Sequence, residues 1–190
     1  MVKTDLSNFD PVKVGKLDAD MWRAYYNHQF FLLFRLLVVL IKNQLGLSWL
    51  LTIRSAYYSA WAATDYRIHK KQGTNSTRVL RNLCKFYGLV SKHSVKSFDF
   101  HKAAELELVW WEVHRRSYKT SIALEQALAE SAAVIYNVKP QKLKEYARYR
   151  AEAMILPRHK GDDQTNRTDW QYITDLTIKS WTALHEAVQN

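Results

Sequence analysis

Glycine and proline are scarce along the whole chain, with five and three residues respectively among 190. Folds built from strands need many tight turns, and those turns draw heavily on these two residues. Hydrophobic residues make up 47% of the chain, and they recur at helical spacing rather than in strict alternation. The sequence therefore predicts an all-α fold, a helical bundle of about seven helices in a single domain over residues 1–190.

A helix-opening pattern occurs twice, at Phe9–Tyr25 and at Phe98–His114. In each copy a Phe-Asp pair is followed by a Lys, a Leu, an acid, a Trp and a polar ring at the same offsets. Helix capping explains the Phe-Asp pair, but it does not require the later residues. We therefore predict an internal duplication, with units over 9–92 and 97–156 and an added C-terminal helix over 168–187.

The later part of the pattern supplies the candidate site residues. Positions i, i+4 and i+7 share one face of a helix. The two predicted stripes are Asp18, Trp22 and Tyr25 in the first copy, and Glu107, Trp111 and His114 in the second. If a pseudo-two-fold axis relates the units, the stripes face one another at the interface. The acids and polar rings would then converge between two Trp side chains.

Two kinds of ligand fit such an interface. Glu107 and His114 pair a carboxylate with an imidazole, which suits Fe, Mn or Zn. Seven residues separate them, about 10.5 Å along a helix, which favours a dinuclear centre or an organic ligand over one ion. A redox function, with the protein as an oxidoreductase, is one interpretation. A cluster of aromatic residues could line a pocket for a flat ligand, which leaves haem or flavin open; its members are Tyr57, Tyr58, Trp61 and Tyr66. The alternative is a non-enzymatic interaction module, in which the polar cluster is structural.

The formal net charge of +10 admits nucleic acid, anionic lipid or an acidic partner. No run of five or six like charges occurs, so nucleic-acid binding is the weaker hypothesis. Self-association into a homo-oligomer stays open. The apolar run Phe30–Ile41 contains Arg35 and is shorter than the about 20 residues of a spanning helix. We expect no transmembrane segment and a central helix covered all round, with peripheral membrane contact as the alternative.

Cys84 is the only cysteine, and no apolar stretch follows Met1 that resembles a signal peptide. These features predict a cytoplasmic protein. Glycine-rich phosphate-binding loops and the Gly-x-Ser-x-Gly motif do not occur in the sequence. Nucleotide-using and serine-hydrolase mechanisms are therefore not expected.

Three segments carry a resemblance. Leu106–Arg115, Arg150–Met154 and Met21–Tyr26 resemble segments of a helical bacterial protein family without an assigned activity. The resemblance implies a bacterial cytosolic protein and no particular reaction. Ferritin-like di-iron proteins resemble this chain in bundle style only. Their Glu-x-x-His pairs do not occur in this sequence, so their ligands are not carried over.

Overall fold

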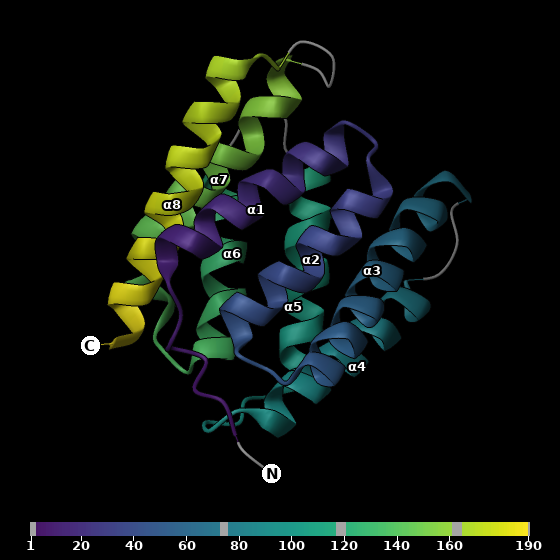
Figure 1. The fold of residues 1–190 in the computed structure, drawn as a ribbon, viewed down its shortest axis with the longest axis vertical. Coiled ribbons are helices and arrows are strands. Elements are labelled where there is room, and N and C mark those ends of the chain that lie inside the picture. The colour runs from purple at the N-terminus through teal and green to yellow at the C-terminus, as the bar shows by residue number, and fades with distance from the viewer. Residues whose placement is uncertain (1–2, 73–75, 117–120, 161–164, 190) are drawn as a thin grey trace.

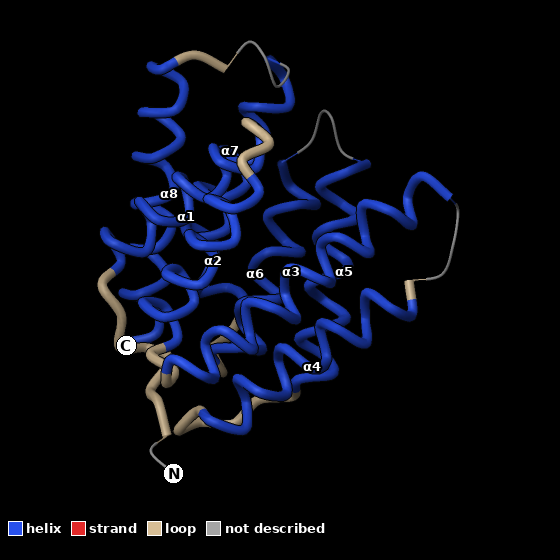
Figure 2. The backbone as a smooth tube through the Cα atoms, turned by 45° about the vertical axis from the view of Figure 1, so that its right-hand side comes forward, coloured by secondary structure: helices blue, strands red, loops and turns tan. Residues whose placement is uncertain are grey.

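The structure is a computed structural model and describes residues 3–72, 76–116, 121–160 and 165–189. These residues form eight α-helices and one short 3-10 helix (Figure 1). Figure 2 draws only helices and loops in the described ranges. The all-α prediction is confirmed, with eight α-helices instead of about seven. They are α1 Pro11–Tyr26, α2 Phe30–Leu45, α3 Trp49–Gln72, α4 Thr77–His93, α5 Phe100–Arg116, α6 Ser121–Tyr136, η1 Pro140–Leu143, α7 Lys144–Lys160 and α8 Arg167–Gln189.

The helices close into a ring in chain order. Each α-helix packs against its neighbours in the sequence, from α1 against α2 through to α7 against α8. The ring is completed by the extensive contact of α8 with α1. In Figure 1, α7 and α8 lie at one side, α3 and α4 lie at the other, and α1 crosses close to α8. A closed ring gives every helix an inward face, so residues far apart in the sequence meet at the centre.

One predicted helix is in fact two. The apolar pattern that runs from Asp10 to about Gln44 predicts one continuous helix, but α1 ends at Tyr26 and α2 begins at Phe30. His28 adopts a left-handed backbone with φ of 57°, which ends the helix and turns the chain. The backbone N–H groups of Asn27, His28 and Gln29 still donate to α1 carbonyls. The break therefore costs few backbone hydrogen bonds and sends α2 in a new direction.

The expectation that the apolar run is covered all round is wrong. Of α2, only Leu40, Ile41 and Leu45 are buried, whereas Phe31 is 97% exposed. In a ring one helix thick, α2 has neighbours on its two sides and on the inward face. Among the described residues, the helices in extensive contact with α2 are α1 and α3, which leaves its outward side chains exposed. Within the described residues, no helix is both long and apolar enough to cross a bilayer.

Two helix ends also differ from the sequence-based boundaries. A proline disfavours helix in the residue before it, which predicts a helix end before Pro157, but Pro157 lies inside the last turn of α7. Thr168 and Gln171 fit the spacing of a capping box, but the hydrogen bonds at the start of α8 come from a reciprocal pair, Asn166 and Asp169. Asn166 Oδ1 accepts from the Asp169 backbone N–H and Asp169 Oδ2 accepts from the Asn166 N–H, each at 3.0 Å. The boundary expected near 118, at the end of α5, lies outside the described residues.

The ring allows one check on the proposed duplication. The helices α1 and α5, which carry the repeated pattern, stand four places apart in a ring of eight, as a two-fold axis requires. A weaker sequence likeness between 77–87 and 140–150 pairs α4 with α7, which stand three places apart. The two likenesses do not follow one rotation, and the duplication stays a prediction.

Candidate functional site

A cavity of about 180 Å³ lies at the centre of the ring. All eight α-helices contribute lining residues, with α2 and α6 supplying most of the aliphatic wall. Leu37, Leu40, Ile41 and Leu128 belong to that wall. Two acids and one guanidinium interrupt it, together with phenol, indole, amide and hydroxyl groups. The polar lining residues are Asp18, Gln44, Ser59, Tyr87, Glu107, Trp110, Ser131, Tyr136, Tyr146, Arg150 and Trp181.

Asp18 forms a buried ion pair across the ring. Its side chain is 1% exposed, and Arg150 Nη1 lies 2.6 Å from Asp18 Oδ2. Trp181 Nε1 donates to the same oxygen at 2.8 Å. The guanidinium also lies 5.3 Å from the Trp22 ring centroid and 5.4 Å from that of Trp181. Burial alone would lower the pKa of Arg150, but Asp18 raises it, and the net pKa lies above its ordinary value. Arg150 is therefore a permanent cation here.

The second oxygen of Asp18 has no hydrogen-bond partner. Asp18 Oδ1 and Ser55 Oγ are the two buried side-chain polar atoms of the described residues that lack one. Of these two residues, only Asp18 lines the cavity. An unpaired buried acceptor costs about 1–3 kcal/mol, and more for a charged group. Asp18 therefore carries one buried oxygen without a donor beside the cavity, and a hydrogen-bond donor that reached this oxygen would satisfy it.

Glu107 sits on another wall of the cavity with a full set of donors. Tyr87 OH and Trp110 Nε1 donate to Oε2 at 2.9 and 2.7 Å. Trp111 Nε1 donates to Oε1 at 3.0 Å. Three donors and no acceptor are the partners of an ionised carboxylate. Burial raises the pKa of Glu107, against the lowering effect of these donors and of Arg150.

Three tyrosine hydroxyls in the cavity wall stay protonated. Burial, with the charge and hydrogen bond of Glu107, holds the pKa of Tyr87 well above its usual range. Burial also raises the pKa of Tyr136 and Tyr146. Gln44 Nε2 donates to Tyr136 OH at 3.2 Å. Each phenol can therefore act as a neutral donor at physiological pH.

The raised pKa of Glu107 predicts a pH-dependent contribution to stability. An acid whose pKa is higher in the folded state binds protons more tightly when folded. Its contribution to the free energy of unfolding is therefore greatest at low pH. It declines as pH rises from the unfolded value of about 4.3 through the raised folded value. We expect the difference in unfolding free energy between wild type and Glu107→Gln to shrink as pH rises across this window, measured by urea denaturation.

Glu105→Gln is the matched control for that series, because Glu105 lies on the same helix and its side chain is 55% exposed. It should give a difference from wild type that changes little with pH. At the low-pH end of the window Glu107→Gln should cost about 1–3 kcal/mol, since an amide N–H₂ would face one of the indole or phenol donors. A parallel pH profile for the two variants would contradict the pKa shift.

The six predicted site residues fall into three groups. Asp18 and Glu107 line the same cavity. Trp22 and Trp111 contact the groups that line it, through Arg150 and Glu107 respectively. Tyr25 and His114 do not line the cavity: Tyr25 is 44% exposed, and His114 Nε2 lies 3.3 Å from the Met154 carbonyl oxygen.

Sequence reasoning missed most of the partners of the two acids. Arg150 and Trp181 hold Asp18, whereas Tyr87 and Trp110 hold Glu107. A signal for Arg150 was present in the sequence. It shares one helical stripe with Leu143, Tyr146, Ala147, Ala151 and Met154, all of which are buried. A cation on an otherwise apolar stripe indicates a buried partner.

The geometry lends a metal ion little support. The described residues contain no group of three or more His, Cys, Asp and Glu side chains that could hold one. Both oxygens of Glu107 already accept hydrogen bonds, so a metal would have to displace them. Metal binding by Glu107 and His114 stays a prediction.

The cavity is also small for the larger cofactors. Sites for drug-sized ligands occupy about 300–1,000 Å³, and this cavity has about 180 Å³. Haem or flavin would not fit without opening the ring. Tyr57 and Trp61, which were proposed to line a flat pocket, are exposed on the surface instead.

Comparison of the chain with protein-family models, with curated proteins and with solved structures gave no match. The resemblance of three segments to a helical bacterial family stays a prediction.

Proposed function

We propose that the chain is a binding protein for a small organic cation, an amine or amidine, in its central cavity. The observation that supports this most directly is Asp18 Oδ1, which has no hydrogen-bond partner and belongs to a residue of the cavity wall, whose exposed surface is more apolar than polar. A protonated nitrogen would donate to that oxygen. The apolar part of the ligand would lie against Leu37, Leu40 and Leu128.

Size and lining favour an organic ligand over water alone. A single water takes about 30 Å³ of liquid volume and needs two to four polar partners. The cavity holds about 180 Å³, which is close to the about 150 Å³ of an engineered apolar cavity that binds benzene. Water near Asp18 Oδ1 would leave the aliphatic end of the cavity unfilled. A ligand with a short apolar body and one donor group fills both ends.

The charges around the cavity favour a cation. Asp18 and Arg150 neutralise each other. Glu107, surrounded by three donors, adds a negative charge that no cation contacts directly. A cationic ligand would offset it, and the indole rings of Trp110 and Trp181 in the wall offer faces for cation–π contact.

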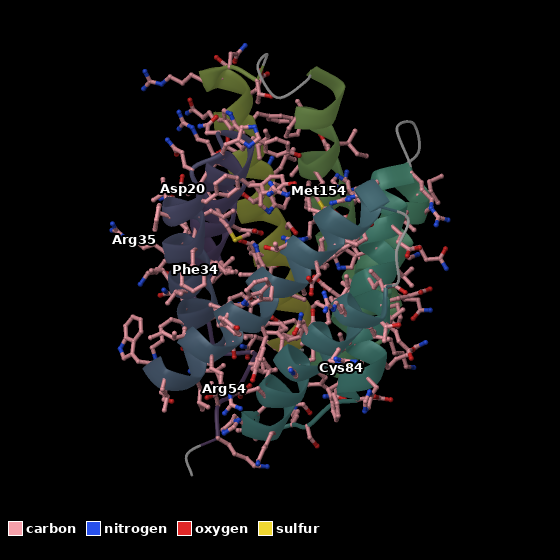
Figure 3. All side chains as sticks on the ribbon, turned by 90° about the vertical axis from the view of Figure 1, so that its right-hand side faces the viewer. Asp20, Phe34, Arg35, Arg54, Cys84 and Met154 are labelled. Carbon is pink, nitrogen blue, oxygen red and sulfur yellow. The ribbon has the colours of Figure 1, made fainter. Side chains whose placement is uncertain are left out.

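Three probes that share a ring and differ in head group test the proposal: benzylamine, benzyl alcohol and toluene. We expect isothermal titration calorimetry to rank benzylamine tightest. Asp18→Asn should reduce its advantage over benzyl alcohol at least about tenfold, because a charge-assisted bond contributes about 1.5–3 kcal/mol. Asp20→Asn, the same change at an exposed position of α1, should preserve it. Asp20 projects from the outer edge of the molecule (Figure 3).

A second variant keeps the test decisive if Asp18→Asn fails to fold. Ala132 lines the cavity from α6, so Ala132→Leu should fill part of it and weaken all three probes together. The proposal is wrong if no probe binds the wild type and the natively purified protein carries no small molecule in its mass spectrum. It is equally wrong if Asp20→Asn removes the preference as strongly as Asp18→Asn.

A further inference from the structure

The outward face of the α2–α3 hairpin is apolar and exposed. Phe31 is 97% exposed and Leu50 is 78% exposed. Single exposed apolar side chains are common on protein surfaces, but a group of large ones indicates a binding surface. We call this surface the α2–α3 face. Its exposed apolar and aromatic members are Phe30, Phe31, Leu32, Phe34, Trp49, Leu50, Ile53, Tyr57 and Trp61.

The two helices present this surface side by side. They pack against each other, and cation–π contacts join them at both ends. Arg67 on α3 lies 5.5 Å from the ring centroid of Phe30 at the start of α2. Lys42 near the end of α2 lies 5.6 Å from the ring centroid of Trp49 at the start of α3. These contacts link the two helices, and the exposed residues of both lie on this one hairpin.

The charges on this surface are all positive. The sequence contains no acid between Asp20 and Asp65, whereas Arg35 and Arg54 are exposed among the aromatic residues. Figure 3 shows Phe34 and Arg35 projecting outward from α2, with Arg54 lower on the hairpin. The whole chain carries a formal charge of +10. A partner for this surface must offer apolar volume and negative charge together.

We propose that the α2–α3 face binds the surface of a membrane that contains anionic lipid. Phe, Leu and Trp side chains enter the boundary between headgroups and acyl chains, and arginine and lysine contact lipid phosphates. Tryptophan and tyrosine are the residues that favour this interfacial layer. A second copy of the chain is a poorer occupant, because a two-fold contact between identical faces would bring Arg35 and Arg54 against like charges.

Flotation of the full chain with vesicles tests the proposal. We expect partition onto vesicles of 30% phosphatidylserine in phosphatidylcholine to exceed partition onto pure phosphatidylcholine at least about tenfold. Phe31→Ser/Leu50→Ser should lower partition onto the anionic vesicles by about tenfold or more. These side chains are exposed, so the variants keep their fold, which circular dichroism checks.

Matched controls separate the surface from general hydrophobicity and charge. Ile122 is 76% exposed on α6, and Ile122→Ser should leave partition within about twofold. Arg35→Glu/Arg54→Glu should lower binding to anionic vesicles at least about tenfold. Lys139→Glu/Lys142→Glu, at exposed positions near η1, makes the same change in net charge and should have a smaller effect.

Three results would overturn the proposal. The first is wild-type protein that binds neither vesicle. The second is a control pair that loses as much binding as the pair on the α2–α3 face. The third is a wild type that forms dimers in sedimentation velocity, with Phe31→Ser/Leu50→Ser as a monomer and vesicle binding unchanged by that variant. This last result would assign the face to self-association.

Discussion

Replacing Arg150 with methionine should lower the free energy of unfolding by about 3–5 kcal/mol, the cost of leaving one partner of a buried ion pair without the other. Asp18 is 1% exposed, so water cannot replace the lost guanidinium. The oxygen that faces Arg150 would keep only the Trp181 N–H. Urea denaturation, followed by tryptophan fluorescence, measures the loss.

Arg148→Met is a closely matched control. Arg148 lies on the same helix, and its Nη2 is 2.6 Å from Glu145 Oε2, the same distance as in the Arg150–Asp18 pair. The two side chains are 49% and 60% exposed, so this pair should contribute about 0–1 kcal/mol. Equal losses in the two variants would show that burial does not set the value of the Asp18–Arg150 pair.

The double variant Asp18→Asn/Arg150→Met tests whether the loss in Arg150→Met comes from the carboxylate left without a partner. Removing both charges also removes the uncompensated carboxylate, and buried pairs replaced together are often nearly neutral. We expect the double variant to recover a large part of the stability lost in Arg150→Met. A double variant that is less stable than the sum of the single changes would contradict a pairwise interaction.

Local signals in the sequence predicted the helices well and their arrangement poorly. Asp10 and Asp99 cap α1 and α5 as predicted, each accepting from first-turn N–H groups at 3.0 Å. Caps depend on a few adjacent residues, so one sequence reveals them. The break at His28 depends on a left-handed backbone, which residues other than glycine adopt uncommonly. No local pattern predicts that conformation.

For the candidate site too, positions within one helix were predicted and contacts between distant helices were not. The i, i+4, i+7 spacing predicted that Asp18 and Glu107 face inward, and both residues line the cavity. The partners could not be predicted, because they come from distant segments: Arg150 lies on α7 and Trp181 lies on α8. Pairing across such distances follows from ring closure, which periodicity within one helix does not encode. Tyr25 does not line the cavity, because it lies two turns beyond Asp18, at the end of α1.

Ring closure itself rests on a close approach of α1 to α8, and it makes Gly15 the most restrictive position of α1. A Cβ atom added there would lie 2.6 Å from Ile178 Cα and 2.9 Å from Ile178 N. These are backbone atoms, so no side-chain rotation relieves the contact, and the two helices must separate. We expect Gly15→Ala to lower the free energy of unfolding by about 2 kcal/mol, within the range of about 1–3 for overpacking.

Gly88→Ala makes the same chemical change but should not lower the free energy of unfolding. A Cβ there would lie 3.4 Å from Phe100 Cδ2, an ordinary contact, and alanine favours a helix over glycine by about 0.5–1 kcal/mol. Gly88→Ala should therefore be neutral or stabilising in urea denaturation. If both variants are stabilised, the close approach of α1 and α8 is not a constraint on the fold.

Gly15→Ala should also disturb the cavity, because the close contact lies within one turn of both partners of the Asp18–Trp181 hydrogen bond. Asp18 follows Gly15 by one turn of α1, and Trp181 follows Ile178 by one turn of α8. Separating the helices at Gly15 would lengthen the 2.8 Å bond from Trp181 Nε1 to Asp18 Oδ2. The indole N–H resonance of Trp181 should therefore shift in Gly15→Ala and stay in place in Gly88→Ala. If Gly15→Ala loses stability but the Trp181 resonance does not shift, the packing of α1 on α8 does not control the geometry of the site.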